Sequence, residues 1–394
     1  MSDTVQAEAK APGITALTEA PAGFDNESNG FPLQFAATME EAKDTFSEVE
    51  LFEDGVGPVF NNTSCVSCHE NPFQVAGTGS QITELRAGHF NGTTFSEHPG
   101  GSLINDRATD RSIQEHVLSG NEVRTQRITL SIMGDVYVEA IDSNMLAAVA
   151  AGQPAGQRGT FIQVAVAESG GALRGGRFGW KNQNASLTSF SGDAYVNEMG
   201  VTNRLFPTEN TSNGTNVQGG PFDGKGDPTA TGEDDAGDVD VFADFMRSLK
   251  APPRGPITAA VTRGQTQFNN AGCAVCHRAT YNTVPAGTVI NQGALTVSAA
   301  IGDKIIHPFG DYLLHDIGTG DGIVQNGGQA TRNMVRTAPL WGIGVRDRLM
   351  HEGNVYTVPD AIQRHGNQGS ASRAAFNRLS AAAQNDLVAF VLSL

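Results

Sequence analysis

All four cysteines of the chain lie in two copies of one five-residue motif. The segments 65–69 and 273–277 read CVSCH and CAVCH, so both fit the pattern CxxCH. This spacing is the attachment signature of c-type haem. Two thiols on one turn can each bond a vinyl group of the same porphyrin, and the adjacent histidine then faces the iron. The sequence therefore predicts two covalently bound haems. The predicted attachment residues are Cys65, Cys68, Cys273 and Cys276, and the predicted iron ligands are His69 and His277.

Two other kinds of CxxC chemistry fit the spacing less well. A structural zinc site places its two CxxC pairs about 15 to 20 residues apart, whereas these pairs are separated by about 200 residues. A redox-active CxxC disulfide does not require a histidine directly after each pair. Zinc and disulfide chemistry therefore remain minor alternatives to haem.

Each iron has a second axial position, and its ligand decides what the haem does. An iron with two strong protein ligands transfers electrons, whereas an iron with an open position can bind peroxide or oxygen. The remaining candidates are seven histidines and six methionines. They are His89, His98, His116, His307, His315, His351 and His365, and Met133, Met145, Met199, Met246, Met334 and Met350.

The segments around the two motifs resemble one another. Residues 60–69 and 268–277 both read FNNxxCxxCH. Each copy is followed by a similar amphipathic helix, predicted over 239–249 and 386–394. The chain therefore looks duplicated, with one haem unit in each half.

The pattern of helix signals gives the boundaries of these units. A helix predicted over 39–52 leads into the first motif, and Asp238 is the predicted N-cap of the helix that closes the first unit. Pro252-Pro253 then marks the domain boundary. The predicted divisions are an N-terminal tail over 1–37, an N-terminal haem domain over 38–253 and a C-terminal haem domain over 254–394.

The composition indicates long irregular loops. Glycine accounts for 47 of 394 residues, or about 12% against a usual value of about 7%. A strand pair is expected only around 127–141. The predicted fold is mainly α, with two cytochrome c-like haem domains, long irregular loops and a few short strands.

The charge of the chain excludes several kinds of partner. Its 26 Lys and Arg residues against 42 Asp and Glu residues give a net charge of −16. Nucleic acids and anionic membrane surfaces would be repelled, and we expect a small basic cytochrome or a similar redox protein instead. No stretch approaches the ~18 to 20 apolar residues that span a bilayer.

Covalent haem attachment takes place outside the bacterial cytoplasm, which predicts a periplasmic location. The N-terminus shows no basic region followed by an apolar region, the pattern of an export signal. We therefore expect that residue 1 is a processed or altered start and that the original leader is missing from this chain.

An acidic stretch offers a second cofactor hypothesis. Residues 223–227 and 233–235 are rich in Asp and Glu, whose hard oxygen ligands suit Ca²⁺. The alternative is a solvated acidic loop, which such composition favours.

Five further stretches carry a resemblance to a known family. They read GRFGWK at 176–181, NEMG at 197–200, LLHD at 313–316, RTAPLW at 336–341 and AIQRHG at 361–366. Together with the CxxCH motifs, they make the chain similar to the bacterial di-haem cytochrome c peroxidase and MauG superfamily. It looks closest to the di-haem oxidoreductase branch, also called thiol-oxidoreductase-like. The similarity extends from about Phe52 to Leu394.

The resemblance implies roles for three residues. Trp180 corresponds to an aromatic residue between the haems that relays electrons, although the sequence alone favours an ordinary core tryptophan. Glu198 corresponds to the carboxylate that moves a proton between the two peroxide oxygens. His365 corresponds to the distal ligand of the C-terminal haem, where relatives carry Met or Tyr. Two imidazoles usually give a lower potential than His and Met, so this departure puts a standard peroxidase cycle in doubt.

The resemblance gives a looser indication for the N-terminal haem. In some relatives a histidine shortly after the first motif caps the iron until reduction releases it, and His89 is the nearest match, ahead of His98 and His116. The histidines that flank the second haem, His307, His315 and His351, are expected to hydrogen-bond propionates or backbone. Met350 is a minor rival of His365.

These observations favour an oxidoreductase in which the C-terminal haem transfers electrons and the N-terminal haem, beside Glu198, reduces peroxide or a related oxidant. One alternative is a di-haem electron carrier with both irons closed by protein ligands. Another is a MauG-like oxidase of a protein or organic substrate.

Overall fold

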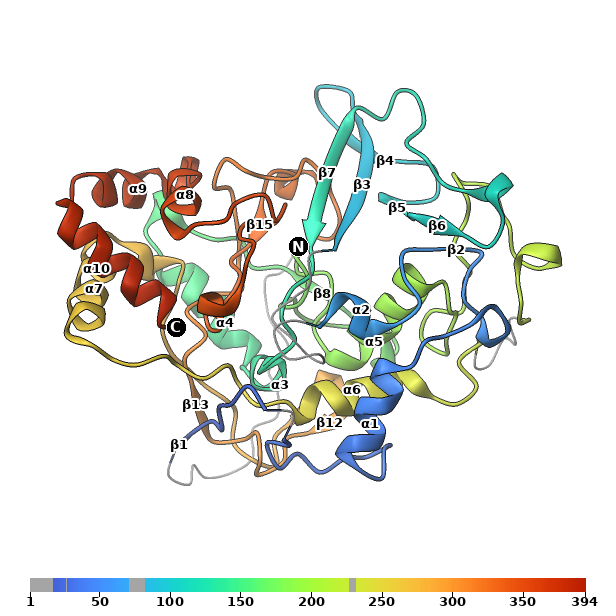
Figure 1. The fold of residues 1–394 in the computed structure, drawn as a ribbon, viewed down its shortest axis with the longest axis horizontal. Coiled ribbons are helices and arrows are strands. Elements are labelled where there is room, and N and C mark those ends of the chain that lie inside the picture. Colours follow the sequence, from blue (N-terminus) through green and yellow to red (C-terminus); the bar gives the residue numbers. More distant parts are fainter. Residues whose placement is uncertain (1–16, 26, 71–81, 227–231) are drawn as a thin grey trace.

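The computed structural model describes residues 17–25, 27–70, 82–226 and 232–394, in which helices and short strands are mixed (Figure 1). The α-helices are α1 (Met39–Ser47), α2 (Cys65–Cys68), α3 (Asp135–Glu139), α4 (Ser143–Gly152), α5 (Leu187–Ala194), α6 (Asp238–Ser248), α7 (Ala259–Asn270), α8 (Val358–Gln363), α9 (Ser370–Asn377) and α10 (Ala381–Leu392). The strands are β1 (Thr18–Glu19), β2 (Val59–Phe60), β3 (Thr83–Phe90), β4 (Phe95–Glu97), β5 (Leu103–Ile104), β6 (Arg107–Ala108), β7 (Val123–Ile128), β8 (Gln163–Val166), β9 (Ala172–Gly175), β10 (Tyr281–Asn282), β11 (Val289–Ile290), β12 (Leu295–Thr296), β13 (Lys304–Ile306), β14 (Leu314–His315) and β15 (Val335–Arg336).

Helices α1 and α6 form the support of the first CxxCH motif. Thr38 caps α1 by accepting a hydrogen bond from the Glu41 backbone N–H, 3.1 Å away. Ala42 and Phe46 lie four residues apart and are both buried, as expected for one helix face. The Phe46 ring packs 4.7 Å from the Phe245 ring of α6. This contact fixes α1 against the helix that closes the first unit.

A four-stranded antiparallel sheet stands over the first motif (Figure 1). Its central strand, β3, pairs with β7 along six residue pairs, from Thr83 opposite Ile128 to Gly88 opposite Val123. Strands β4 and β5 pair with the other edge of β3. Because side chains alternate along a strand, Glu84 and Arg86 share one face of β3.

Helices α7 and α10 pack closely to form the support of the second motif. A Cβ atom on Gly264 of α7 would lie 1.9 Å from the Asp386 carbonyl oxygen of α10. Only glycine therefore permits this approach. Phe268 and Phe390 pack in the same interface, with ring centroids 5.2 Å apart.

The N-terminal segment lies along both halves of the chain. β1 pairs in parallel with β13, and the Asn29 side chain donates hydrogen bonds to the carbonyls of Arg247 (2.9 Å) and Leu249 (3.0 Å). The larger hydrophobic core likewise combines residues of α3 and α6 with Tyr312 and Trp341. The two haem units therefore share buried contacts.

Two local expectations are wrong. The strand pair expected around 127–141 is replaced by the end of β7 and by α3, since a run of buried apolar residues fits a buried helix as well as a strand. Asp238 is not an N-cap but the first residue of α6. Asp234 takes the capping role, because its carboxylate accepts hydrogen bonds from the N–H groups of Gly237, Asp238 and Val239. Within the described residues, no helix has the length and apolar character needed to cross a membrane.

Candidate functional site

The two CxxCH motifs have the same local conformation. Cys65–Cys68 form α2, and Cys273–Val275 form a short helical turn. In both copies the histidine N–H donates a hydrogen bond of 3.0 Å to the carbonyl of the first cysteine. All four cysteines are free and partly buried. Each turn therefore presents two thiols and one imidazole, as haem attachment requires.

The thiols of Cys65, Cys68 and Cys273 are poor nucleophiles for disulfide exchange. Burial raises the pKa of Cys68 to about 12 and that of Cys273 to about 11. Burial also raises the pKa of Cys65 far above the usual range of a thiol. Because the thiolate is the reactive form in exchange, these environments disfavour a redox-active disulfide.

A phenylalanine packs against each motif histidine. Phe268 of α7 lies 6.3 Å from His277, and Phe46 of α1 lies 6.2 Å from His69, measured between ring centroids. In the sequence repeat, Phe268 aligns with Phe60, which lies in β2 instead of a helix. The structural counterpart of Phe268 is therefore Phe46, because the first unit places β2 between its helix and its motif.

The second motif faces a histidine across a cavity. The ring centroids of His277 and His365 are 6.4 Å apart, and both residues line the cavity. With metal–nitrogen bonds of about 2 Å, two imidazoles on opposite sides of one metal have centroids about 6 Å apart. Nδ1 of His277 lies 3.1 Å from the Phe309 carbonyl, and Nδ1 of His365 lies 2.8 Å from the Ala361 carbonyl. Both Nε2 atoms are thus left to coordinate a metal.

Burial lowers the pKa of His277 to about 4 and also lowers that of His365. Both rings are therefore neutral at physiological pH, the state in which imidazole binds metals. His365 lies two residues beyond the end of α8. The structure thus brings His365 to the motif that the sequence assigned to it.

The first motif faces a larger and more polar cavity. His69 and Cys68 line it together with Glu84, Arg86 and Glu198. Among the described residues that line this cavity, His69 is the one histidine, and there is no methionine or tyrosine. Burial lowers the pKa of His69 to about 4. In the described lining of this cavity, His69 therefore faces no iron ligand comparable with His365.

Two methionines lie near the first motif in a different place. Met199 and Met246 are buried with Phe46 in a smaller pocket that also touches His69. Both methionines line the same small pocket as Phe46, which packs on His69. Neither methionine lines the polar cavity. This placement leaves the polar side of His69 accessible.

Glu198 and Glu84 form a pair of neighbouring carboxyl groups in the polar cavity. Glu198 also accepts a hydrogen bond of 2.7 Å from the Asn61 side chain. Burial and the neighbouring charge of Glu84 raise the pKa of Glu198 to about 8. Burial opposes ionisation of Glu84 too, but Arg86 outweighs it and lowers the pKa of Glu84. Glu198 is therefore protonated at neutral pH and Glu84 is ionised.

Glu84 and Arg86 belong to no motif in the sequence. Glu-Leu-Arg in β3 has the alternation of a strand with one polar face, and this was the one signal available. Only the pairing of the sheet and its position over the first motif bring these residues to Glu198.

Trp180 lies between the two cavities, since it lines both of them. Its side chain is buried, with 9% exposure. The indole N–H donates a hydrogen bond of 2.7 Å to the Ile128 carbonyl at the end of β7. The ring of His351 packs edge-on at 6.2 Å on the side of the second cavity. Trp180 thus occupies the place expected of a residue between two haems.

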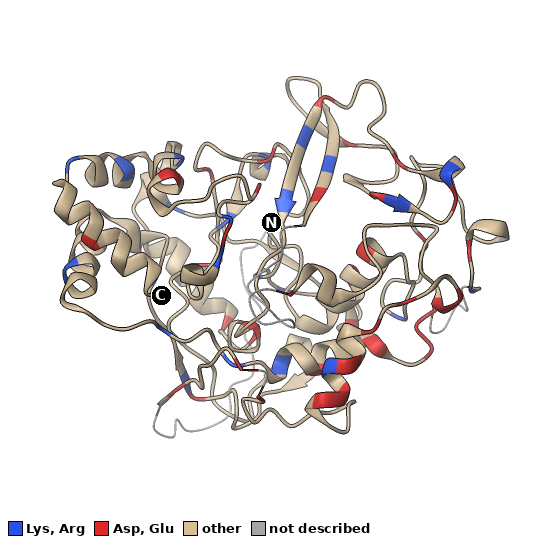
Figure 2. Ribbon diagram, in the orientation of Figure 1, with Lys and Arg blue, Asp and Glu red and all other residues tan. Residues whose placement is uncertain are grey.

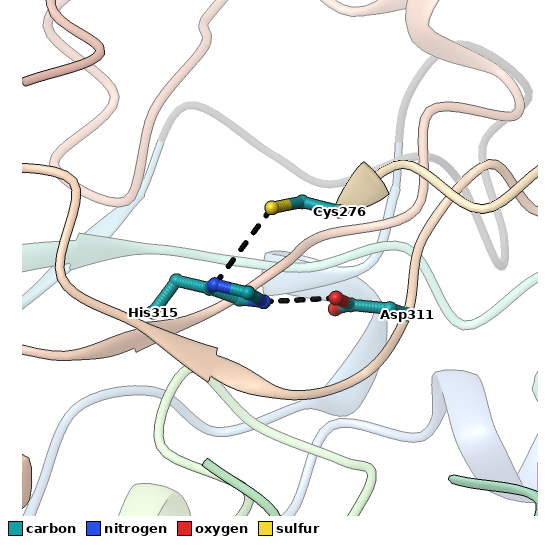
Figure 3. A group of neighbouring side chains, drawn as sticks. All are labelled: Cys276, Asp311 and His315. Carbon is teal, nitrogen blue, oxygen red and sulfur yellow. Dashed lines mark hydrogen bonds and ion pairs between the residues drawn. The ribbon is translucent and has the colours of Figure 1, made fainter. Parts of the chain in front are cut away.

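Cys276, Asp311 and His315 form a cluster beside the second motif (Figure 3). Their ligand atoms lie within 4.8 Å of one another, and in the described part of the chain this is the one group with the spacing of a metal site. Nε2 of His315 lies 2.8 Å from Asp311, and Nδ1 lies 3.7 Å from the Cys276 sulfur. Burial opposes protonation of His315, but the bond to Asp311 raises its pKa to about 10. His315 is therefore a cation beside the second motif at neutral pH, and it would have to lose this proton to bind a metal.

The remaining predicted histidines lie elsewhere. His89 is about half exposed, and its Nδ1 lies 2.8 Å from Glu122. It falls on the opposite side of β3 from Glu84 and Arg86 in the strand alternation, and it does not line the cavity of His69. The structure therefore does not bring His89 to the first motif, and the suggestion that it caps that iron fails on geometry.

His98 and His116 are also absent from the lining of that cavity. His351 bonds the Thr319 carbonyl, and His307 contacts Thr280 at 3.0 Å. Met350 also lines the second cavity, in which the ring of His365 lies 6.4 Å from the ring of His277.

The acidic stretch considered for Ca²⁺ has other uses. Asp223 accepts hydrogen bonds from backbone N–H groups, Asp234 caps α6, and Asp235 forms an ion pair of 3.0 Å with Lys225. Asp227 lies outside the described residues. No cluster with metal-binding spacing was found there among the residues that the structure describes.

The two cavities fit haem in several respects. Each holds one CxxCH turn at its wall. Arg336, Arg346 and Arg348 line the second cavity, and Nε of Arg348 is buried without a hydrogen-bond partner. Such an unpaired guanidinium suits an anionic group such as a haem propionate. The residues present therefore fit one haem at each motif.

The sequence of the chain matches one family over most of its length. The family is described as "Di-haem oxidoreductase, putative peroxidase", and the match covers residues 73–394. It includes the second CxxCH motif and begins just after the first. No curated protein is similar enough to count as a match.

Several solved structures have a related course of the backbone. The di-haem peroxidase BthA from Burkholderia thailandensis gives a TM-score of 0.42 at 16% identity, over 97% of this chain and 95% of that chain. Hydrazine synthase from Kuenenia stuttgartiensis gives 0.40 at 14% identity, over 98% and 100%. A MauG-like protein associated with microbial copper homeostasis gives 0.38 at 13% identity, over 98% and 94%. Likeness at this level carries no argument about function.

Proposed function

The chain belongs to the di-haem oxidoreductase family, and from this premise we propose that it is a periplasmic c-type enzyme that reduces hydrogen peroxide or a related oxidant at its N-terminal haem. In this proposal the C-terminal haem transfers electrons and does not bind the oxidant. Both haems are attached covalently, through Cys65 and Cys68 and through Cys273 and Cys276.

The difference between the two sites is the observation that carries this proposal. His277 faces His365 at 6.4 Å, a separation that suits one iron held on both faces. His69 faces a polar cavity whose described lining offers no second histidine, methionine or tyrosine. These residues would close one iron and leave the other open, which is the division needed for electron transfer and catalysis.

The protein holds and orients the reactants in the N-terminal site. When bound, the haems supply electrons and the iron that binds the oxidant. Glu198 carries a proton at its carboxyl group and moves it between the two peroxide oxygens as their bond breaks. Asn61 holds one carboxyl oxygen of Glu198 at 2.7 Å, so the acid is presented in a fixed orientation.

Electrons pass between the sites by way of Trp180. The residue lines both cavities and is held by its bond to the Ile128 carbonyl. Its fixed indole gives an aromatic step between the closed and open haems. This is the role that the family resemblance assigns to Trp180.

A basic protein partner fits the surface charge. Acidic residues gather along α1 and the start of α6 (Figure 2), where Glu40, Glu41, Asp44 and Glu48 are exposed. This face lies on the elements that support the first motif. We propose that a small basic redox protein is the electron donor, attracted by the net negative charge of the chain, with an association rate that falls as salt screens the charges.

Peroxide turnover tests the proposal directly. Purified protein with both haems is pre-reduced and mixed with peroxide and a reduced cytochrome, and oxidation of the cytochrome is followed optically. We expect peroxide-dependent turnover. Protein that neither binds peroxide at one haem nor turns it over, even after pre-reduction, would contradict the proposal. Consumption of peroxide coupled only to oxidation of a protein or organic substrate would instead identify a MauG-like oxidase.

A further inference from the structure

The polar cavity contains a second acidic side chain that has no assigned role. Glu84 of β3 and Glu198 of the turn Tyr195–Met199 line the same cavity, and their carboxyl groups are close enough to share a hydrogen bond. Two carboxyl groups can form such a bond only when one of them carries a proton, because two carboxylates have no donor between them. The pair therefore holds one proton and one negative charge.

The surrounding side chains decide which member of the pair is charged. Arg86 contacts Glu84 through two N–H groups, at 2.6 Å and 3.0 Å. Arg127 of β7 lies 3.9 Å from the same carboxylate. The hydrogen bond that the Glu198 carboxyl group accepts from Asn61 comes from a neutral amide. A two-pronged guanidinium contact strongly favours the ionised form, so the charge lies on Glu84 and the proton on Glu198.

The cation that faces Glu84 is itself part of a buried network. Arg127 donates to Asp321 at 2.6 Å, and Lys181 lies 3.2 Å from the other oxygen of Asp321. Arg127, Asp321 and Lys181 are all buried. Lys181 follows Trp180 in the chain. The position of Glu84 is therefore fixed by contacts that reach from the first cavity to the residue between the cavities.

We infer that Glu84 is a positioning residue for peroxide chemistry, which holds the proton on Glu198 and accepts it when Glu198 takes a proton from the substrate. This inference rests on the proposed function and extends it to a carboxyl pair. Glu84 acts through Glu198 and does not itself contact the substrate.

The proton count of the step is balanced. Peroxide gives one proton to the free lone pair of the Glu198 carboxyl group, and the proton already on Glu198 moves to Glu84. Both carboxyl groups are then neutral. The bound haems would supply the two electrons that break the oxygen–oxygen bond. The pair returns one proton to the oxygen that leaves as the first water, and the other oxygen takes two protons from solvent to become the second water. Glu84 is again charged and Glu198 again protonated.

A substitution that removes only the charge tests this inference. Glu84→Gln keeps the shape of the side chain and can still contact Glu198, but it cannot accept a proton. Glu97→Gln is the matched control, because Glu97 is an exposed acid of β4 that lines the same cavity. Glu84→Asp is the conservative variant, since it keeps a carboxylate at the same position.

The first measurement is the infrared C=O band of the protonated carboxyl group, identified as the band lost in Glu198→Gln. We expect Glu84→Gln to lose this band at neutral pH, because Arg86 then stabilises an ionised Glu198. Glu84→Asp and Glu97→Gln should keep the band. A band unchanged in Glu84→Gln would overturn the inference, whether or not the protein reduces peroxide.

The second measurement is peroxide turnover as a function of pH. The charged groups that face the pair are Arg86, Arg127, Asp193 and, before haem attachment, the Cys68 thiol. We expect Glu84→Gln to reduce turnover by about tenfold or more, with the loss at alkaline pH beginning at a lower pH. Glu84→Asp should restore part of the rate. Glu53→Gln, which changes an exposed acid that lines neither cavity, should match the native protein.

These outcomes separate the inference from the proposed function. Turnover that is lost in Glu198→Gln and unchanged in Glu84→Gln would overturn the role of Glu84 alone. If Glu84→Gln does not take up two haems, Glu84→Asp decides. A shifted carboxyl band with a reduced rate supports the inference, and an unchanged band with an unchanged rate overturns it.

Discussion

The substitution Glu198→Gln tests the proposed proton chemistry most sharply. Glutamine has nearly the same shape, so its amide oxygen can still accept the bond from Asn61, now 2.7 Å long. Its amide N–H can donate to Glu84 in place of the carboxyl O–H. The local structure is therefore preserved, whereas the exchangeable proton is lost.

The size of the effect follows from the state of the group. Burial and the charge of Glu84 raise the pKa of Glu198 to about 8, so about nine tenths of the molecules carry the proton at pH 7. A positioned acid or base contributes about 10²- to 10⁴-fold to a rate. We expect peroxide turnover by Glu198→Gln to fall by about that factor.

The pH profile supplies a second test of the same residue. Native turnover should fall as the pH rises above about 8, where Glu198 loses its proton. Because the pKa is higher in the folded protein than in the unfolded chain, the neutral carboxyl group also stabilises the fold at low pH, and this contribution is lost as the pH rises through about 8. Thermal unfolding of Glu198→Gln should lack that dependence.

The assay is steady-state oxidation of a reduced cytochrome by peroxide, with haem content and the absorption spectrum of each variant measured in parallel. Haem content should stay at two per chain in Glu198→Gln. A variant with two haems, a native rate within about threefold and an unchanged pH profile would refute the reasoning.

Further predictions concern the rest of the electron path and the fold. Trp180→Phe keeps an aromatic ring but loses the hydrogen bond to Ile128. We expect slower electron transfer between the haems in flash or stopped-flow measurements, with unchanged static spectra. Transfer rates equal to those of the native protein would exclude the relay. His365→Ala removes the ligand that faces His277, so a second high-spin haem should appear in the optical spectrum, and a spectrum that stays low-spin would point to another ligand. Gly264→Ala places a methyl group against the Asp386 carbonyl and should lower the free energy of unfolding by about 1–3 kcal/mol, which denaturant titration can measure; native stability would show that the helices can separate at no cost. Added salt should slow association with a basic cytochrome in stopped-flow mixing, and a rate that is insensitive to ionic strength would exclude a partner attracted by the charge of the chain.

Much of the chemistry could be predicted from short sequence motifs without knowledge of the fold. A CxxCH segment contains its own attachment thiols and its own ligand, so the two haem turns could be predicted from sequence alone. The facing residue His365 came from a family resemblance, and the structure places it opposite His277. The helices around both motifs could be predicted because their apolar spacing is regular.

The polar half of the first site could not be found in this way. Glu84 and Glu198 are separated by 114 residues, and they meet only because β3 pairs with β7 and stands over the first motif. The literal sequence repeat is also misleading at Phe60, since Phe46 contacts His69. The apolar residues around Val136 fit the pattern of a strand. In the structure they form the helix α3, and they are buried on all sides.

Electron paramagnetic resonance of the oxidised protein tests the central claim, which is that one haem is closed by two histidines and the other is open. The protein must first be shown to contain two haems per chain. We then expect one low-spin signal from the haem between His277 and His365 and one high-spin signal from the haem on His69. Two low-spin signals that persist after reduction and reoxidation would contradict the account and identify an electron carrier.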